Sequence, residues 1–546
     1  MLTGYVYIVY LRSEKLLTAV CNAVLALLDE WEGMMIQNLM ATVLRSSIIL
    51  AASLIAQSFL LLIPFGGVAW ADPKAISLVN ISQNALYDPL CPVLAGYPAG
   101  GCRGSLLAEV WVAPHNPNVV AVAYRTYGLP INTNADKDAR TADAHVSISV
   151  DSGNRFRDTN LMPILREPAV NINEPEPDLY FCNIPHVAFS SDGFMFAGCS
   201  FFTALGNIGP LPKQGRVTVT ASRDFGLTWS APTYGLRIGN FAPGLTGLNG
   251  GTAPEDTPWD GSHGFSDPQG PYYTTSGGYV VVSLDHAKSW GTVYELDSQS
   301  LPGWTVSGVG VMNAAHGVLG APFAANATPI AGPVCPCLGY ATSLDYGKTW
   351  SAQLVAEADQ FNSNVSGDTA RSPFSASDPS TPGTGVAISA YTPDHTSVQV
   401  FYTEDGGRKW KSAAAMPYPT GVNVTNASHV GVGYTRDGRV LLVWRGFEVS
   451  GAFNTFAALL NGNHFGQTIR VSPQPSTYPL ITDEAACEEA FPEPPPRACY
   501  DTTSGGGDFS TWITGNDRYA FVGFPYIPDG LHEDIYLAKI PLSTMH

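Results

Sequence analysis

Seven strand-like apolar runs of this chain each begin at a polar residue, and these residues are the side chains best suited to chemistry. They are Glu109, His186, His263, His316, Arg371, His429 and Asp508. A histidine with a pKa near neutrality can act as general acid or base, and an arginine can hold a carboxylate through two hydrogen bonds. If the runs surround one axis, these side chains meet at one mouth. Arg371 or Arg445 would then pair with an anionic group of a ligand, while His186 or a nearby tyrosine moved a proton.

Two other interpretations of these polar residues stay open. Side chains on the axis of a wet channel need polar character simply to be solvated. Converging histidines would also permit a metal site, but no two histidines stand at i, i+2 or i, i+4. The acidic segment Asn134–Asp143 lacks the ordered oxygen-ligand spacing of a calcium loop. We therefore expect no cofactor and no metal, with Ca²⁺ at that segment as the alternative.

One eight-residue pattern recurs five times and organises the chain. The copies begin at Ser149, Ser222, Ser283, Ser343 and Thr403, and each has Asp at its third position and Phe or Trp at its eighth. Their starts lie 73, 61, 60 and 60 residues apart. A period near 60 with one short motif per period is typical of propeller blades, and it is too long for most helical solenoids.

The pattern has the chemistry of a tight turn between two strands. Its Asp accepts hydrogen bonds from backbone N–H groups, and its Gly takes a positive φ that other residues rarely adopt. The final aromatic residue begins the next strand and buries a large area. Because Ala287 stands where the third copy should have Gly, we expect that turn to be strained or altered. The repeats are then scaffold and not catalytic.

The sequence Ser343-Leu-Asp-Tyr-Gly-Lys-Thr-Trp350 and its four relatives resemble the Asp-box, or BNR, repeat of the sialidase superfamily. The resemblance implies an all-β fold, a single β-propeller of four-stranded blades whose boxes lie on outer-strand turns away from the active face. Seven apolar runs predict seven blades, with the six blades of sialidases proper as the alternative. We place the propeller at residues 72–546. The strand-like segments 75–81 and 534–540 would close the ring by pairing, which removes an exposed edge.

The resemblance also implies a kind of site. Sialidases clamp the substrate carboxylate with three arginines, use a tyrosine with a glutamate partner as nucleophile, and use an aspartate as acid and base. The usual Arg-Ile-Pro strand does not occur in this chain. The residues that could take these parts are Arg125, Arg371 and Arg445, then Asp256 near the third blade's start, and Tyr434 or Tyr500. The candidate catalytic set is His186, Arg371, Arg445, Asp256, Tyr434 and His429.

Residues 1–71 form an N-terminal extension before the propeller. Residues 1–34 have the apolar stripe of an amphipathic helix, either an anchor or a stretch ahead of the true first methionine. A short basic region, the apolar run Ile48–Phe65 and an A-x-A ending at Ala71 then predict a secretory signal that is cleaved after Ala71. An uncleaved membrane anchor is the alternative, because the run is near spanning length.

The cysteines favour an oxidising compartment, either the periplasm or the outside of the cell. Of the 9 cysteines, Cys21 precedes the signal, so an even number stays in the mature chain. Cys182 and Cys199 flank a hairpin and should lie close together. The pairs that would close short loops are Cys91 with Cys102 and Cys487 with Cys499. Cys335 and Cys337 are hard to place, because a bridge between residues two apart is strained.

The net charge of −18 and the low charged content of 14% restrict the partners. An acidic surface repels phosphate backbones, so we expect no nucleic acid. We expect a secreted or periplasmic monomer that acts on extracellular glycans, as a glycoside hydrolase or polysaccharide lyase, without a membrane span after cleavage. The alternative is a non-catalytic glycan-binding or cell-surface interaction propeller. A propeller carrying a redox or hydrolytic metal is a third hypothesis.

Overall fold

The computed structural model describes residues 76–82, 102–103, 105–130, 140–165, 180–203, 215–238, 252–253, 263–276, 278–327, 335–361, 374–381, 384–415, 417–450, 452–476, 511–527 and 532–546. The chain divides into two units, Met1–Pro73 and Lys74–His546. Every described residue lies in the second unit, so the predicted helix and signal segment fall outside the described residues. The second unit is almost entirely β, with a short helix α3 (Met162–Leu165) and a 3-10 turn η6 (Leu542–Thr544).

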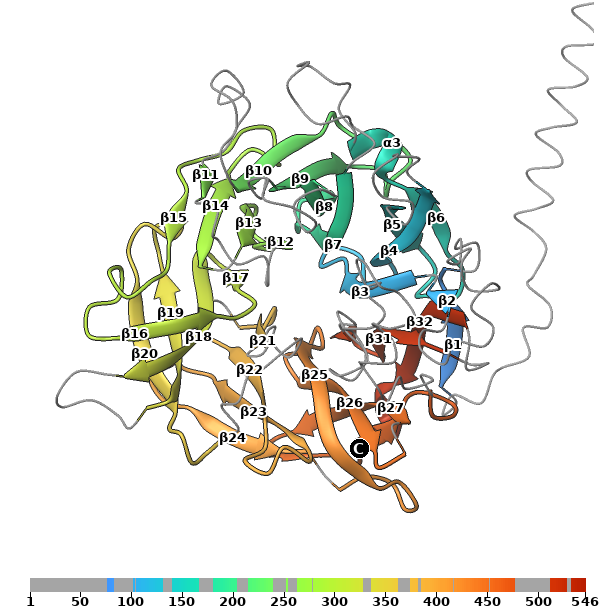
Figure 1. Ribbon diagram of the computed structural model, residues 1–546, viewed down its shortest axis with the longest axis vertical. Coiled ribbons are helices and arrows are strands. Elements are labelled where there is room, and N and C mark those ends of the chain that lie inside the picture. The colour runs from blue at the N-terminus through green and yellow to red at the C-terminus, as the bar shows by residue number, and fades with distance from the viewer. Residues whose placement is uncertain are drawn as a thin grey trace, which may run out of the picture. The chain divides into compact units, whose positions relative to one another are not determined.

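The described strands form seven sheets, which are the blades of a propeller (Figure 1). Blade 1 consists of β3 (Ser105–Val112), β4 (Val120–Pro130), β5 (Arg140–Ser149) and β6 (Arg157–Asn160). Blade 2 consists of β7 (Tyr180–Phe189), β8 (Met195–Thr203), β9 (Gly215–Ser222), β10 (Thr233–Ile238) and β11 (Thr252–Ala253). Blade 3 consists of β12 (His263–Ser266), β13 (Tyr272–Ser276), β14 (Tyr279–Ser283) and β15 (Tyr294–Glu295).

Blade 4 has an inner edge made of two pieces, β16 (Thr305–Val309) and β17 (Asn313–Ala315), which both pair with β18. Its other strands are β18 (Val318–Ala327), β19 (Cys337–Ser343) and β20 (Ser351–Ala356). Blade 5 consists of β21 (Phe374–Ser377), β22 (Val386–Tyr391), β23 (Val398–Thr403) and β24 (Lys411–Ala414). Blade 6 consists of β25 (Val424–Tyr434), β26 (Val440–Glu448), β27 (Phe453–Asn461), β28 (His464–Phe465) and β29 (Ile469–Arg470).

Blade 7 joins the two ends of the propeller unit. It contains β30 (Trp512–Gly515), β31 (Tyr519–Tyr526), β32 (His532–Pro541), β1 (Ser77–Asn80) and the short β2 (Cys102–Arg103). β1 pairs antiparallel with β32, from Ser77 opposite Lys539 to Asn80 opposite Tyr536. Ser82 strengthens this closure, since its Oγ donates to Asp534 at 3.1 Å and accepts the Ile535 N–H at 2.9 Å. The predicted pairing of the two terminal segments is confirmed.

Blade packing explains why the strands are apolar on both faces. Each sheet is covered by a neighbouring blade on either side, so successive residues are buried alternately against one neighbour and the other. Val120–Ala123 of β4 and Leu441–Trp444 of β26 have no exposed surface at all. The inner strands contact one another in the order β3, β7, β12, β17, β21, β25, β30 and back to β3. The ring is therefore closed, and the seven predicted blades are confirmed.

Three local expectations can be compared with the structure. A disulfide joins Cys182 on β7 to Cys199 on β8, as predicted. A second disulfide joins Cys335 to Cys337, which the sequence argument left without a partner. Ala287 adopts a φ of +61°, yet its turn is not altered, because the Ala287 N–H still reaches Ser283 Oγ at 2.9 Å. The other predicted cysteine pairs involve residues outside the described ranges.

Four predicted blade starts differ from the structure. β3, β7 and β25 begin at Ser105, Tyr180 and Val424, earlier than the predicted Glu109, His186 and His429. The fourth is His316. His316 and Gly317 both have positive φ and form the tight turn between β17 and β18. The inner edge of blade 4 begins earlier, at Thr305. His316 therefore lies at the opposite end of its blade from the position that the sequence pattern suggested.

Candidate functional site

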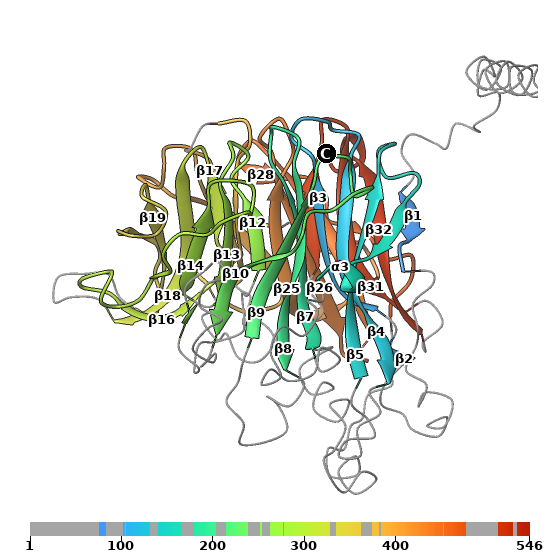
Figure 2. The ribbon, with the colours of Figure 1, turned by 90° about the horizontal axis from the view of Figure 1, so that it is seen from above.

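The propeller has two unlike faces, because a four-stranded meander places its connections at alternating ends. The turns after first and third strands share one face, and the five predicted repeats all lie between third and fourth strands. We call this the box face. The connections after second strands, and those between blades, leave the other face, which we call the loop face. Figure 2 shows the strands running between these two faces.

The five boxes share one hydrogen-bond scheme. The hydroxyl at the first position donates to the Asp and accepts the N–H of the fifth residue, as Ser343 does with Asp345 at 2.9 Å and Gly347 at 2.8 Å. The same Asp accepts the N–H of Thr349 at 2.8 Å. In the second box, hydrogen bonds from Thr228 lower the pKa of Asp224 to about 2. The carboxylates of the boxes are hydrogen-bonded within their own turns, which fits a scaffold role.

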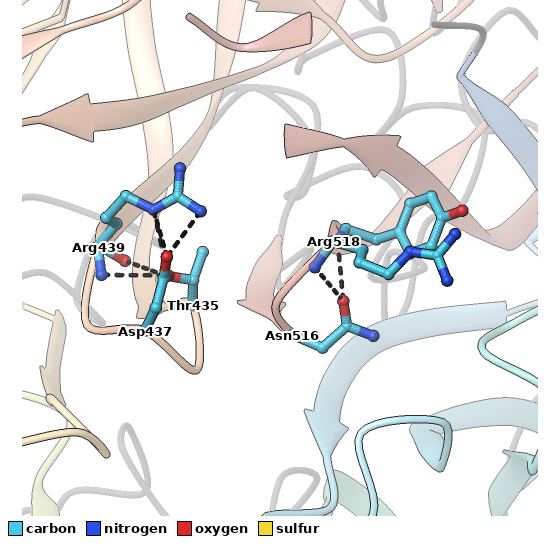
Figure 3. Close-up of polar contacts among 6 residues, drawn as sticks. Thr435, Asp437, Arg439, Asn516 and Arg518 are labelled. Atoms are coloured by element: carbon cyan, nitrogen blue, oxygen red, sulfur yellow. Dashed lines mark hydrogen bonds and ion pairs between the residues drawn. The ribbon is translucent and has the colours of Figure 1, made fainter. Parts of the chain in front are cut away.

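Side-chain contacts between blades tie the box face together. Asp267, after β12, accepts the N–H groups of His316 and Gly317 in the next blade at 3.0 and 2.6 Å. Arg436 lies 3.6 Å from Asp517 of blade 7. Figure 3 shows the two turns concerned, one with Thr435, Asp437 and Arg439 and the other with Asn516 and Arg518. Such close internal pairing leaves the box face stiff.

At the loop face, described strands of successive blades end and resume far apart in the sequence. β6 ends at Asn160 and β7 begins at Tyr180, β20 ends at Ala356 and β21 begins at Phe374, and β29 ends at Arg470 and β30 begins at Trp512. Variable loops on a rigid scaffold are where binding and catalytic residues concentrate. The loop face and the channel behind it are therefore the candidate functional site.

His186 lies inside the channel wall, where blade 2 meets blade 3. It is in the middle of β7, fully buried, and opposite Gly198 of β8. A Cβ added to Gly264 of β12 would lie 2.8 Å from His186 Nε2 and 2.0 Å from Tyr272 Oη. Glycine at 264 therefore allows the imidazole and the phenol to converge on one point of the neighbouring strand.

Glu109 and Trp111 of β3 complete this group from blade 1. Trp111 Nε1 donates to Glu109 Oε1 at 2.6 Å, and only 3% of Glu109 is exposed. Burial, and then the charge of Glu109, raise the pKa of Tyr272 well above its usual value. Trp111 also packs against hydrophobic clusters formed by several blades. We call Glu109, Trp111, His186 and Tyr272 the inner cluster.

Two other candidate residues lie in blade 6. Arg445 is fully buried on β26, with its guanidinium carbon 5.0 Å above the Phe453 ring. His429 lies in the middle of β25, where a bulge gives it a φ of +51°. Its Nδ1 is 2.7 Å from Ser428 Oγ, and Ser428 pairs with Arg445. The structure thus places His429 and Arg445 on adjacent strands.

Of the predicted set, the described residues His186, His429 and Arg445 come from blades that are not adjacent. Blades 2 and 6 are not neighbours in the ring, so His186 is separated from His429 and Arg445. Tyr434 ends β25 at the box face, where burial and then the charge of Asp378 raise the pKa of its hydroxyl. Arg371, Asp256, Asp508 and Tyr500 lie outside the described residues, as does the side chain of His263.

The inner cluster contains residues that the sequence argument missed. Trp111 stands two positions after the predicted Glu109 in the same strand, and alternation along a strand could have indicated it. Tyr272 has no such signal, because it belongs to a second strand and reaches across to the blade before it. Within the described ranges, no three His, Cys, Asp or Glu side chains are grouped to hold a metal ion. Residues 134–139 of the proposed calcium segment are not described.

Comparisons with known proteins find similarity in architecture only. No family model matches the sequence, and no curated protein does so either. Among solved structures, the Hadza microbial sialidase Hz136 matches at 11% identity and TM-score 0.39, over 81% of this chain and 66% of that chain. A protein of unknown function from Dyadobacter fermentans matches at 14% identity and TM-score 0.41, over 85% and 99%. The intramolecular trans-sialidase from Ruminococcus gnavus matches at 12% identity and TM-score 0.36, over 68% and 94%.

The class defined by these sheets is the seven-bladed β-propeller. What the site can do chemically depends on the residues of this chain.

Proposed function

We propose that this protein is a secreted propeller that recognises extracellular glycans at its loop face. The proposal rests on the difference between the two faces. The box face consists of short turns tied by internal hydrogen bonds, whereas at the opposite face described strands of successive blades end and resume far apart in the sequence. The Asp-box resemblance supplies the class of ligand. The disulfide between Cys182 and Cys199, together with the predicted signal segment, supports export.

Binding without cleavage is supported by where the described candidates lie. His186 and Arg445 have no exposed surface, and Tyr434 lies at the box face. Hydrolysis needs an acid and a base that both reach the bond to be broken. The described side chains suit a rim that holds a sugar better than a cavity that cleaves one.

Glycoside hydrolysis is the second candidate, and the inner cluster favours it. A phenol and an imidazole from blades 3 and 2 converge at Gly264, and the charge of Glu109 in blade 1 acts on the phenol. These are groups that transfer protons or attack a sugar. If loop movement admitted a substrate to this depth, Tyr272 and Glu109 would be the reacting pair.

The two candidates can be separated by measuring binding and turnover on the same samples. The protein is screened against sialosides and uronate-containing polysaccharides by calorimetry, and against a fluorogenic sialoside for release. Recognition at the loop face predicts binding without release. It also predicts that His429→Ala weakens binding by about tenfold or more, as expected when one good polar contact is lost.

His316→Ala is the matched control for His429→Ala. Both histidines are half-buried and have positive φ, but His316 is in the turn between β17 and β18 at the box face, whereas His429 lies within β25. Equal loss of binding in the two variants would refute a loop-face site. Turnover that Tyr272→Phe and Glu109→Gln abolish would replace the binding proposal with hydrolysis. Turnover that survives His186→Ala and Arg371→Ala would exclude the predicted roles of those two residues.

A further inference from the structure

The box face carries a regular set of exposed aliphatic side chains. Among the described residues, five large apolar side chains are strongly exposed. Four of them lie in the boxes of successive blades, namely Val150 (62%), Leu227 (69%), Leu284 (62%) and Leu344 (77%). The fifth is Val449 (81%), which follows β26 at the loop face. Scattered exposed apolar residues are normal, but here one stands on each box turn of blades 1 to 4.

The geometry of the box turns directs the exposed aliphatic side chains away from the blades. Val150, Leu284 and Leu344 each stand between the hydroxyl residue and the Asp of their box, both of which bond inward to the turn. The residue between them has no place in that network and projects away from the blade. In blade 5 the same position is Glu404, which pairs with Lys411 at 2.9 Å. The aliphatic tips therefore cover blades 1 to 4 and stop there.

The carboxylates of this face are paired within the protein. Asp192 meets His286 at 2.7 Å, and Asp437 meets Arg439 at 3.0 Å. Each box Asp is bonded to its own turn, and basic residues such as Lys348 and Arg408 stand in the same turns. This balance contrasts with the net charge of −18 on the whole chain. Acidic and basic side chains are therefore mixed on the box face.

The chain also enters the propeller at this face. Ser77, the first residue of β1, stands opposite Lys539, whose Nζ donates to Asn154 of the first box at 2.9 Å. Residues 66–76 separate β1 from the apolar run Ile48–Phe65. They can span at most roughly 40 Å when fully extended. Whatever precedes residue 76 in the chain therefore joins the propeller at its box face.

We propose that the box face of blades 1 to 4 docks on a bilayer of zwitterionic phospholipid. Val150, Leu227, Leu284 and Leu344 enter the boundary between headgroups and acyl chains, and the loop face points away. A fluid surface accepts separate tips on successive turns, whereas a protein partner requires one continuous apolar core. Anionic lipid is disfavoured by the charge of the chain. The proposal does not depend on what the loop face binds.

Photocrosslinking on the full chain tests the orientation, even when residues 48–65 already hold it in the membrane. Benzoylphenylalanine is incorporated at Leu344 or at Val449, and the protein is irradiated with phosphatidylcholine vesicles. Mass spectrometry should find lipid adducts at position 344 and none at 449. Equal adducts at both positions, or adducts at 449 alone, would overturn the proposal. Crosslinks from position 344 to a second copy of the chain would show a dimer contact instead.

Vesicle flotation of the protein as released by its host measures its affinity for the bilayer. Leu284→Ser with Leu344→Ser should reduce partition into phosphatidylcholine vesicles by about tenfold per side chain. Val449→Ser is the matched control, since it removes an equally exposed aliphatic side chain from the opposite face, and it should leave partition unchanged. Equal losses in the two samples would contradict docking through the box face.

Discussion

Gly347→Ala tests the packing of each box against the blade before it. Gly347 has a φ of +95°, and a Cβ there would lie 2.6 Å from Val280 Cγ1 of blade 3. The left-handed backbone costs about 1–2 kcal/mol for a residue with a Cβ. The methyl group adds about 1–3 kcal/mol of overpacking. A stiffer unfolded chain offsets about 0.4–1 kcal/mol. We expect a net loss of about 2–3 kcal/mol.

Two other glycines separate these contributions. Gly193 has a φ of +92° and open space around its Cα, so Gly193→Ala should cost only the backbone term, about 1 kcal/mol. Gly308 has open space and no positive φ, so Gly308→Ala should be neutral or stabilising by about 0.5 kcal/mol.

Urea unfolding followed by tryptophan fluorescence, with disulfides intact, should give midpoints in the order Gly308→Ala, Gly193→Ala, Gly347→Ala, from highest to lowest. Equal midpoints for the last two variants would show that the box does not pack on the preceding blade, and would refute the blade arrangement described here.

Three further predictions concern pH, the disulfide and ring closure. The folded pKa of Asp224 is lowered to about 2, so its contribution to stability is complete above the unfolded value near 4 and is lost as pH falls toward 2. The melting temperature should therefore fall over that pH range. Asp224→Asn should lower the melting temperature at pH 7 more than at pH 2. Replacing Cys182 and Cys199 together by alanine opens a loop with a sequence separation of 17. The free energy of unfolding, measured by denaturant titration, should fall by about 3 kcal/mol. A fall near zero would mean that the disulfide is not formed. Ser82→Ala removes a partner of buried Asp534 and should cost about 1–3 kcal/mol, and faster proteolysis near residue 76 should accompany it if β1 closes the ring.

The repeats made the architecture predictable because each box is a local device. Hydroxyl, Asp, Gly and aromatic residues define the turn within eight positions, so their spacing reveals the blade period without any knowledge of long-range contacts. The same local logic located Cys182 beside Cys199. The pairing of β1 with β32 is long-range, and it was predicted from the need to close the ring. Ala287 shows its limit, since the turn keeps its hydrogen bonds at a positive φ that sequence preference disfavours.

The site was less predictable because it depends on contacts between blades. His316 follows a short apolar run but is a turn residue, and the inner edge of blade 4 is split by a bend that has no sequence signature. Tyr272 and His186 converge only because Gly264 has no side chain, and Gly198 leaves room for His186 in the same way. Tyr434 was judged by its residue type, whereas the length of β25 decides that it ends at the box face.

The most direct test of a loop-face recognition site is a crystal structure of the protein with a bound glycan found in the binding screen. We predict sugar density at the loop-face end of the channel, beside the blades that carry His429 and the inner cluster. Density on the box turns, with the loop face empty, would contradict the account.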